Sequence, residues 1–315
     1  MTSTPNHADA PGTPDPDGVP ATGDTATYPT DIGSATSSAS GKPVDLAGVS
    51  DDAASPADRS TAGQADGSAP PPAGSGTRLT FNAPLSAERA LRLATDLAAT
   101  NPSLVVDLGC GWAELLLMTL AGAREAHGVG VDTHVPDLAR ARATAAARGL
   151  AGRVDLVDGA AADHTEVADV VLNIGAFHAF GSIPEALTAL RARVRDGGRL
   201  LFGVEYWEHP PTSTELANLW EGTTVDDCPS LADLVDQAVA AGFRPIRTET
   251  VTRGEWEEYE SGHMADRELW LAANPDHPDA EAVRHSLDEQ RSIWLRGHRD
   301  VLGFAYLTLV AVRVP

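Results

Sequence analysis

Residues 105–114 read Val105-Val-Asp-Leu-Gly-Cys-Gly-Trp-Ala-Glu114 and combine a strand pattern with a glycine turn. The first residues form a short apolar run bounded by turn residues, which is typical of a strand buried in a parallel sheet. Asp107 falls at the carboxyl end of this predicted strand. Gly109 and Gly111 follow it, and a backbone without Cβ atoms lets a ligand approach closely. A helix predicted over residues 114–123 would present its N-terminus at the same place.

A second acid comes at the end of the next predicted strand. Residues 130–132 read Gly-Val-Asp, and Asp132 stands 23 residues after Gly109. A carboxylate in this position can accept hydrogen bonds from both hydroxyls of a ribose. The sequence therefore indicates a nucleoside-containing ligand at the carboxyl edge of an open α/β sheet. Glu114 replaces the third glycine of a dinucleotide fingerprint, and an acid beside a helix N-terminus disfavours a pyrophosphate and hence an NAD-dependent oxidoreductase.

Beyond the N-terminal region, short apolar runs alternate with helical patterns. Ser86 is the predicted N-cap of a helix whose apolar face is Ala90, Leu93, Ala94 and Leu97. Strands that alternate with helices indicate βαβ units and a parallel sheet. The further predicted strands are residues 126–131, 154–157, 168–173, 199–205 and 243–251, and the further predicted helices are residues 136–148, 184–194 and 231–241.

Residues 253–299 interrupt this alternation before the last strand. They are acidic and carry aromatic residues, and their spacing predicts two helices separated by Asn274-Pro275. The apolar pattern of residues 303–313 then predicts a final strand. We expect the insertion to cover the carboxyl edge of the sheet, together with the helix before residue 101, and to narrow the cleft there.

The first 76 residues differ in composition from the rest of the chain. They contain no Glu, Phe or Trp, and ten Asp against Lys42 and Arg59 give them a net charge of −8. A segment with so few large apolar groups cannot bury enough surface to offset its conformational entropy. Residues 1–76 are therefore predicted to be a disordered, low-complexity acidic tail, and residues 77–315 a single α/β domain.

The charge balance bears on the possible partners. The chain has 23 Lys and Arg against 45 Asp and Glu, a net charge of −22. A field of this sign repels phosphate backbones and anionic membranes, so neither a nucleic acid nor a membrane is expected as a partner. Cys110 and Cys228 are too few for a structural zinc site, and no metal is expected. Without a signal peptide or a membrane-length apolar run, a cytoplasmic location is expected, and the oligomeric state stays open.

Four segments, in this order, resemble the motifs of class I S-adenosylmethionine-dependent methyltransferases. They are Asp107-Leu-Gly-Cys-Gly111, Gly130-Val-Asp132, residues 168–173 with Gly175-Ala-Phe-His178 after them, and Val194-Arg-Asp-Gly-Gly-Arg-Leu-Leu-Phe202. The resemblance covers about residues 77–315. It implies a doubly wound, seven-stranded, mostly parallel sheet whose last strand is antiparallel, with a helical insertion before that strand. It also implies S-adenosylmethionine as the cofactor and methyl transfer as the reaction.

By position, the resemblance assigns contacts to the amino-acid end of the cofactor. Asp107 would hold the methionine ammonium group, directly or through water. Gly109 and Gly111 would line the methionine and ribose portion. Asn173 would contact the methionine end, close to the methyl group that is transferred.

The resemblance also assigns contacts to the nucleoside. Asp132 would accept hydrogen bonds from the ribose hydroxyls, and Thr133 would lie near the adenine. The family often has an Asp after the third strand for the adenine amino group, but Ala160 occupies that position here. Either Asp163 or the backbone of Ala161 would then contact the adenine.

Residues that face the methyl acceptor are expected after the fourth and fifth strands. The candidates for proton removal are His178, Glu205 and Glu208. Each also has a purely structural interpretation, because a histidine can hydrogen-bond a loop and a carboxylate can be solvated or paired with an arginine. The prediction is a methyltransferase that acts on O, N or C of a small, neutral or cationic organic acceptor. The alternatives are an aminopropyl transferase on the same fold and a non-catalytic, regulatory S-adenosylmethionine-binding protein.

Overall fold

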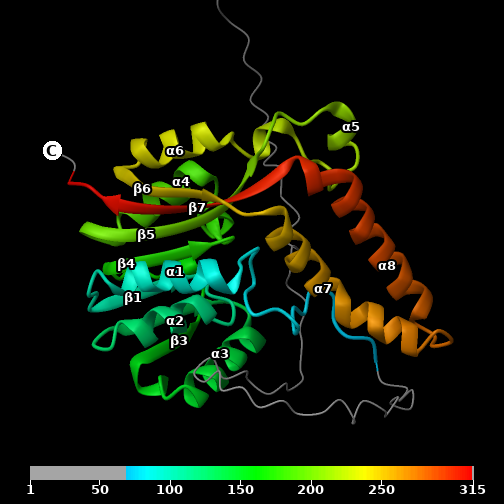
Figure 1. The fold of residues 1–315 in the computed structure, drawn as a ribbon, viewed down its shortest axis with the longest axis horizontal. Helices are drawn as coiled ribbons and strands as arrows, with labels where there is room; N and C mark the ends of the chain where they lie inside the picture. Colours follow the sequence, from blue (N-terminus) through cyan, green and yellow to red (C-terminus); the bar gives the residue numbers. More distant parts are fainter. Residues whose placement is uncertain (1–68, 314–315) are drawn as a thin grey trace, which may run out of the picture. The chain divides into compact units, whose positions relative to one another are not determined.

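The computed structural model describes residues 69–313, so the predicted tail lies outside the described residues as far as residue 68. Within the described part, seven strands form one sheet in the order β3-β2-β1-β4-β5-β7-β6 (Figure 1). β7 runs antiparallel to β5 and β6, and the other neighbouring strands are parallel, as predicted. The strands are β1 (Leu104–Leu108), β2 (His127–Asp132), β3 (Val154–Asp158), β4 (Ala168–Ile174), β5 (Val194–Trp207), β6 (Phe243–Thr250) and β7 (Leu302–Ala311).

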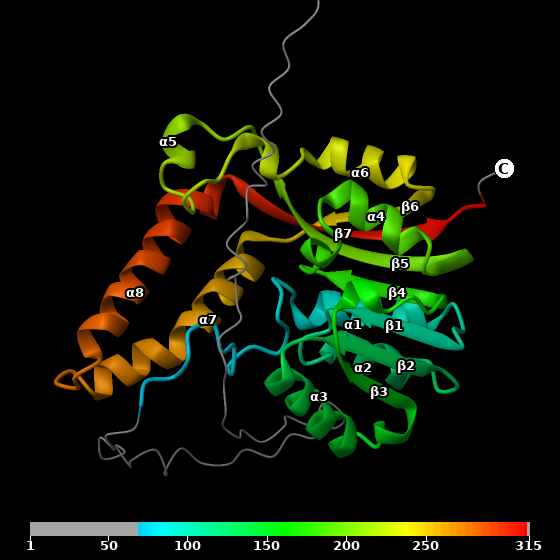
Figure 2. The same cartoon turned by 180° about the vertical axis from the view of Figure 1, so that it is seen from behind.

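Helices cover both faces of this sheet (Figure 2). α1 (Ala87–Ala98), α2 (Glu114–Gly122) and α3 (Val135–Ala147) share one apolar core with the first face, and α4 (Ile183–Arg191) and α6 (Leu231–Ala240) share a second core with the other. In β1, Val105 belongs to the first core and Val106 to the second. Apart from Asp107, the strand is apolar because both of its faces are buried. The remaining short helices before β6 are α5 (Ser213–Leu216), η1 (Ala151–Arg153), η2 (Ala161–Asp163), η3 (Phe177–Phe180) and η4 (Val225–Asp227).

Helix α1 forms as its sequence predicts. The Ser86 hydroxyl accepts a hydrogen bond from the Arg89 amide, and the predicted apolar face is buried. Full burial of Leu93 and Leu97 contributes roughly 1.5–3 kcal/mol each. However, α1 packs on the face of the sheet against α2, and the expectation that it covers the carboxyl edge is wrong.

Residues 253–299 form two antiparallel helices beside the carboxyl ends of β5 and β6 (Figure 1). α7 (Arg253–Ala273) and α8 (Ala280–Ser292) are separated at the predicted Asn274-Pro275, and a π-helical turn η5 (Ile293–Gly297) and a 3-10 turn η6 (His298–Asp300) lead into β7. The two helices share a small apolar core of their own, made of Met264, Trp270, Val283, Leu287 and Trp294. None of the helices within residues 69–313 is long and apolar enough to cross a membrane.

The chain before α1 is attached to the domain by its backbone carbonyls. Gly74 O accepts from His263 Nδ1 of α7 (3.1 Å), Leu79 O from Arg140 Nη2 of α3 (2.6 Å), and Thr80 O from Trp112 Nε1 (2.7 Å). The guanidinium of Arg140 also lies 4.0 Å from the Trp112 ring centre. The hydrogen bond at Gly74 thus holds to the domain a part of the segment that the sequence assigned to the tail.

Candidate active site

A glycine loop turns the chain from β1 into α2. The amides of Gly109 and Cys110 donate to Val131 O at 2.9 and 3.1 Å, which ties the loop to the end of β2. Gly109 has φ +84°, and a Cβ atom there would lie 2.2 Å from the Cβ of Ala176. Only glycine fits this position, because the loop packs directly against the segment that follows β4.

Asp132 organises this loop from the end of β2. Its Oδ2 atom accepts a hydrogen bond from the Gly111 amide (2.7 Å), and its Oδ1 atom accepts one from the His134 amide (2.8 Å). Each carboxylate oxygen has further lone pairs. Asp132 can therefore hold the loop and still accept hydrogen bonds from a ligand.

Asp107 lies in the neighbouring strand, and its environment is unusual for a carboxyl group. It is only 6% exposed, and none of the described residues donates a hydrogen bond to its carboxylate. Burial, and secondarily the negative charge of Asp132, raise its pKa to about 8. A buried carboxylate without a partner is costly, and a cation with N–H donors would satisfy it.

Asn173 adds a second unsatisfied acceptor, next to β1. Its Nδ2 atom donates a hydrogen bond to the carbonyl oxygen of Leu108, the residue after Asp107 (2.7 Å). This hydrogen bond fixes the orientation of the Asn173 amide. The Asn173 Oδ1 atom is buried and has no hydrogen-bond partner. The carboxyl edge of β1 and β4 thus presents two acceptors, Asp107 and Asn173, that only a donor-bearing ligand can satisfy.

The residues expected near the adenine lie farther along the same edge. Asp158, the last residue of β3, pairs with Asp132 of β2, so η2 begins close to the end of β2. Ala161 is buried in η2, whereas Thr133 and Asp163 are exposed. The structure therefore brings the expected nucleoside contacts to one edge.

Known proteins are similar to this chain in sequence and in fold. A family model described as a methyltransferase domain matches residues 106–200. The uncharacterized protein YjhP of Escherichia coli (strain K12) is 27% identical over 230 residues, which are 72% of this chain and 92% of that protein. Methyltransferases of Geobacter sulfurreducens and Thiobacillus denitrificans, both solved with S-adenosyl-L-homocysteine, are 25% and 27% identical, with TM-scores of 0.66 and 0.65. Those alignments cover 73% and 74% of this chain and 93% and 94% of theirs. The chain thus contains a methyltransferase domain, and its fold is that of S-adenosylmethionine-dependent methyltransferases.

The three residues predicted to face the acceptor of this methyltransferase are not brought together. His178 is exposed on η3, where the charge of Asp132 acts on its ring. Glu208 accepts a hydrogen bond from the Tyr206 hydroxyl (2.6 Å), and Tyr206 belongs to the core under α4 and α6. Glu205 precedes Tyr206 in β5 and so points to the opposite face, toward α7. Of the three, only Glu205 lies between the sheet and α7.

Other residues of the methyltransferase have roles that the sequence pattern did not reveal. Glu114, interpreted as an acid beside the ligand, pairs at 2.8 Å with Arg148, the residue that caps the end of α3, so its charge is already compensated. Asn82 lies over the glycine loop, because a Cβ atom on Gly111 would be 3.8 Å from its Nδ2 atom. His298 and Glu260, 38 residues apart in the chain, form a buried pair at 3.2 Å. No local signal could have joined these two residues.

Proposed function

We propose that this methyltransferase transfers a methyl group from S-adenosylmethionine to a small organic acceptor held between the carboxyl edge of the sheet and α7. The observation that supports it most is the buried Asp107 carboxylate, which has no hydrogen-bond donor among residues 69–313. The ammonium group of an amino acid supplies the positive charge and the N–H donors that this carboxylate needs.

The residues at the edge fit the rest of the cofactor. Asn173 Oδ1 would accept a second N–H from the same ammonium group. Asp132 would accept hydrogen bonds from the ribose hydroxyls, and the close approach of the backbone at Gly109 and Gly111 leaves room for the methionine chain. Thr133 and η2, with Ala161 and Asp163, would border the adenine.

When bound, S-adenosylmethionine supplies a methyl carbon that is already activated by its positively charged sulfur. The task of the chain is then to align the acceptor with that carbon, to exclude water and to remove a proton where the acceptor carries one. Helix α7 and the segment of residues 74–86 border the edge where the acceptor would approach, and we assign them the role of its cover.

Calorimetric titration of the full-length protein with S-adenosylmethionine, S-adenosylhomocysteine and NAD tests this proposal. We expect micromolar binding of the first two and none of NAD. Asp107→Asn removes the negative charge at nearly constant shape and should weaken both by at least tenfold, or about 1.4 kcal/mol. Asp155→Asn, at an exposed residue of β3, is the matched control. Tight binding of NAD, or an Asp107→Asn protein that binds as well as the wild type, would overturn the proposal.

A further inference from the structure

The side chains between the end of β5 and α7 form a group that the cofactor does not use. We call Glu205, Trp256, Tyr259 and His298 the Glu205 cluster. Glu205 pairs with Phe304 in the register of β5 and β7, and the Phe304 ring lies 6.1 Å from the Trp256 ring, edge to face. The Trp256 ring in turn lies 5.9 Å from Tyr259 and 5.8 Å from His298. Aromatic rings therefore surround one carboxylate.

Within the described part of the chain, the one hydrogen-bond donor to the Glu205 carboxylate is its own backbone amide. No other side chain of residues 69–313 donates a hydrogen bond to it, and its surroundings raise its pKa by burial. His298 is the one charged or titratable group whose field lowers that pKa. No hydrogen bond or ion pair joins the two side chains, so their interaction leaves the hydrogen-bonding capacity of both groups free for a ligand.

His298, whose field acts on Glu205, is held in a fixed position. Its ring is 3% exposed and stacks on Trp220, with 5.1 Å between the ring centres and an angle of 14° between the planes. Its Nε2 atom lies 3.2 Å from Glu260 Oε1. Because an ionised carboxylate only accepts hydrogen bonds, Glu260 keeps the proton of a neutral His298 on Nε2 and leaves the lone pair on Nδ1.

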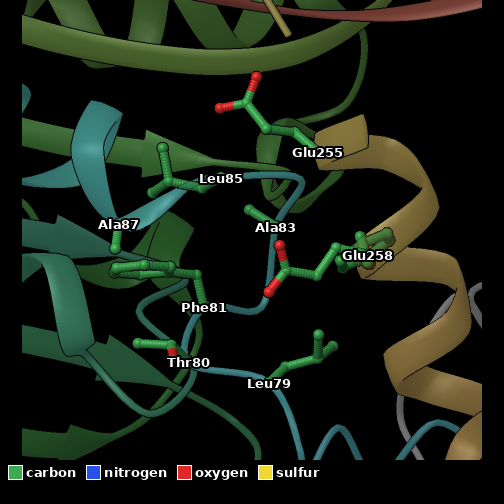
Figure 3. A pocket seen from close by; sticks show the side chains of 9 residues that line it. Leu79, Thr80, Phe81, Ala83, Leu85, Ala87, Glu255 and Glu258 are labelled. Atoms are coloured by element: carbon green, nitrogen blue, oxygen red, sulfur yellow. The ribbon is translucent and has the colours of Figure 1, made fainter. Parts of the chain in front are cut away.

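Trp256 and Tyr259 complete the surroundings. Trp256 Nε1 is buried and has no hydrogen-bond acceptor within residues 69–313. Tyr259 also borders a cavity of about 60 Å³ between α7 and the segment of residues 79–87, and the Glu258 side chain extends from α7 toward that segment (Figure 3). A second carboxylate, Glu258, thus lines this cavity together with Tyr259.

We propose that the Glu205 cluster is the acceptor site of this methyltransferase and that the acceptor is a small amine. This inference rests on the proposed function and adds the substrate class to it. A carboxylate without a side-chain partner among residues 69–313 and the faces of aromatic rings both attract an ammonium group, whereas an anionic acceptor would be repelled. The unpaired Trp256 Nε1 would donate to a neutral oxygen or nitrogen elsewhere in the same molecule.

The transfer requires that the bound ammonium lose a proton first. His298 Nδ1 accepts this proton, and Glu260 and Glu205 stabilise the imidazolium that results. The lone pair of the amine then forms a bond to the methyl carbon, while the bond between methyl carbon and sulfur breaks and its electron pair stays on sulfur. The products are the methylated ammonium and neutral S-adenosylhomocysteine, and His298 passes its proton to solvent.

Binding of small probes tests the site and the substrate class. The full-length protein is saturated with S-adenosylhomocysteine and titrated with butylamine and benzylamine, with butanol and benzyl alcohol as the matched neutral probes, and with benzoate. We expect at least one amine to bind tenfold or more tightly than its alcohol, and no binding of benzoate. Glu205→Gln should abolish this preference, and Glu88→Gln, on the exposed side of α1, should leave it unchanged.

Each outcome of this experiment is informative. If S-adenosylhomocysteine itself does not bind, the proposed function fails. If it binds but neither amine is preferred, or Glu205→Gln retains the preference, only the present inference is overturned. The amine that binds best is then incubated with S-adenosylmethionine, and release of S-adenosylhomocysteine is followed. His298→Asn should keep the amine affinity within about threefold and lower kcat by about 100-fold. A bound amine that the wild type does not methylate, or unchanged kcat in His298→Asn, would contradict the proposal.

Discussion

Asp107 is buried at the end of β1 and lies within the field of Asp132 at the end of the neighbouring parallel strand β2. The two carboxylates differ in their partners. Asp132 accepts two backbone amide hydrogen bonds, whereas Asp107 accepts none from the described residues. The loop is thereby held by one acid, and the other acid is left for a ligand, with its pKa raised to about 8.

The first prediction concerns the pH dependence of cofactor binding. Below pH 8, the Asp107 carboxyl group of the free protein is protonated, and a cationic ligand favours its ionised form. Binding of S-adenosylhomocysteine should therefore release close to one proton at pH 6–7, and affinity should rise with pH up to about 8 and then level off. Calorimetry in buffers of different ionisation enthalpy measures this release. Asp107→Asn should release no proton, and equal proton release by both proteins would refute the assignment.

The second prediction concerns stability without ligand. The pKa of Asp107 is higher in the folded protein than in the unfolded chain, where it is about 3.9. The contribution of Asp107 to the free energy of unfolding is therefore fully present below pH 4 and is lost as the pH rises to 8. Asp107→Asn should therefore increase the free energy of unfolding relative to the wild type. This increase should be larger at pH 8 than at pH 5, by on the order of 1–3 kcal/mol. Urea denaturation at both pH values checks this, and a variant less stable than wild type at pH 8 would contradict it.

The third prediction concerns the contact between the first turns of α1 and α7, which is centred on Glu255 and is called the α1–α7 joint below. Glu255 accepts hydrogen bonds from Arg89 Nε (2.8 Å), from Ser86 Oγ (2.8 Å) and from the Thr252 amide (2.7 Å). Burial by itself would raise the pKa of Glu255, but these donors outweigh it and lower the pKa to about 2. The contribution of Glu255 to the free energy of unfolding is present above about pH 4.3, the pKa of a glutamate in the unfolded chain. It is lost as the pH falls toward 2.

Glu255→Gln should consequently destabilise the protein by about 2–4 kcal/mol at pH 7, because Arg89 keeps a partly buried charge without its main partner. Glu258→Gln, one helical turn later and exposed, should change the free energy of unfolding by less than about 0.5 kcal/mol. Chemical denaturation of both variants gives the comparison. Equal effects of the two substitutions would show that the α1–α7 joint is not a specific source of stability.

The fourth prediction concerns the glycine loop. Gly109→Ala places a Cβ atom 2.2 Å from Ala176 at a backbone angle of φ +84°, so the loop must move. Affinity for S-adenosylhomocysteine should fall by tenfold or more. Gly149→Ala is the matched control, since Gly149 also has positive φ (+69°) but no atom within 4 Å of its Cβ position. It should cost only about 1–2 kcal/mol of stability, and leave affinity unchanged. Equal losses of affinity in the two variants would argue against the steric role of Gly109.

The residues that the proposal places around the cofactor could be located from the sequence because their positions follow from local patterns. An apolar run, a glycine turn and a helix follow one another without interruption from Leu104 to Gly122. Parallel strands end at one edge of the sheet, so Asp107, Asp132 and Asn173 had to converge. The pattern could not reveal which of them is already satisfied by the protein, because that depends on where each loop amide points.

The acceptor side was less predictable, for a physical reason. Glu205 and Glu208 are close in sequence, but Glu205 lies within β5, whereas Glu208 follows the end of the strand and pairs with Tyr206, whose side chain is on the other face. The extension of β5 to Trp207 was not predicted. The pattern of 253–299 indicated two helices correctly, yet not which of their side chains meet the sheet. His298, Glu260 and Glu205 come from η6, α7 and β5.

The sequence by itself thus determined the order of strands and helices, the glycine loop and the acids at the strand ends, because apolar periodicity, turn residues and strand direction act over short stretches of chain. Only the tertiary structure decided that Glu114 is neutralised by Arg148, that Asp107 is left without a donor among residues 69–313, and that the field of His298 acts on Glu205. Those relationships join segments far apart in the chain. They depend on how whole elements pack, and no local pattern specifies that packing.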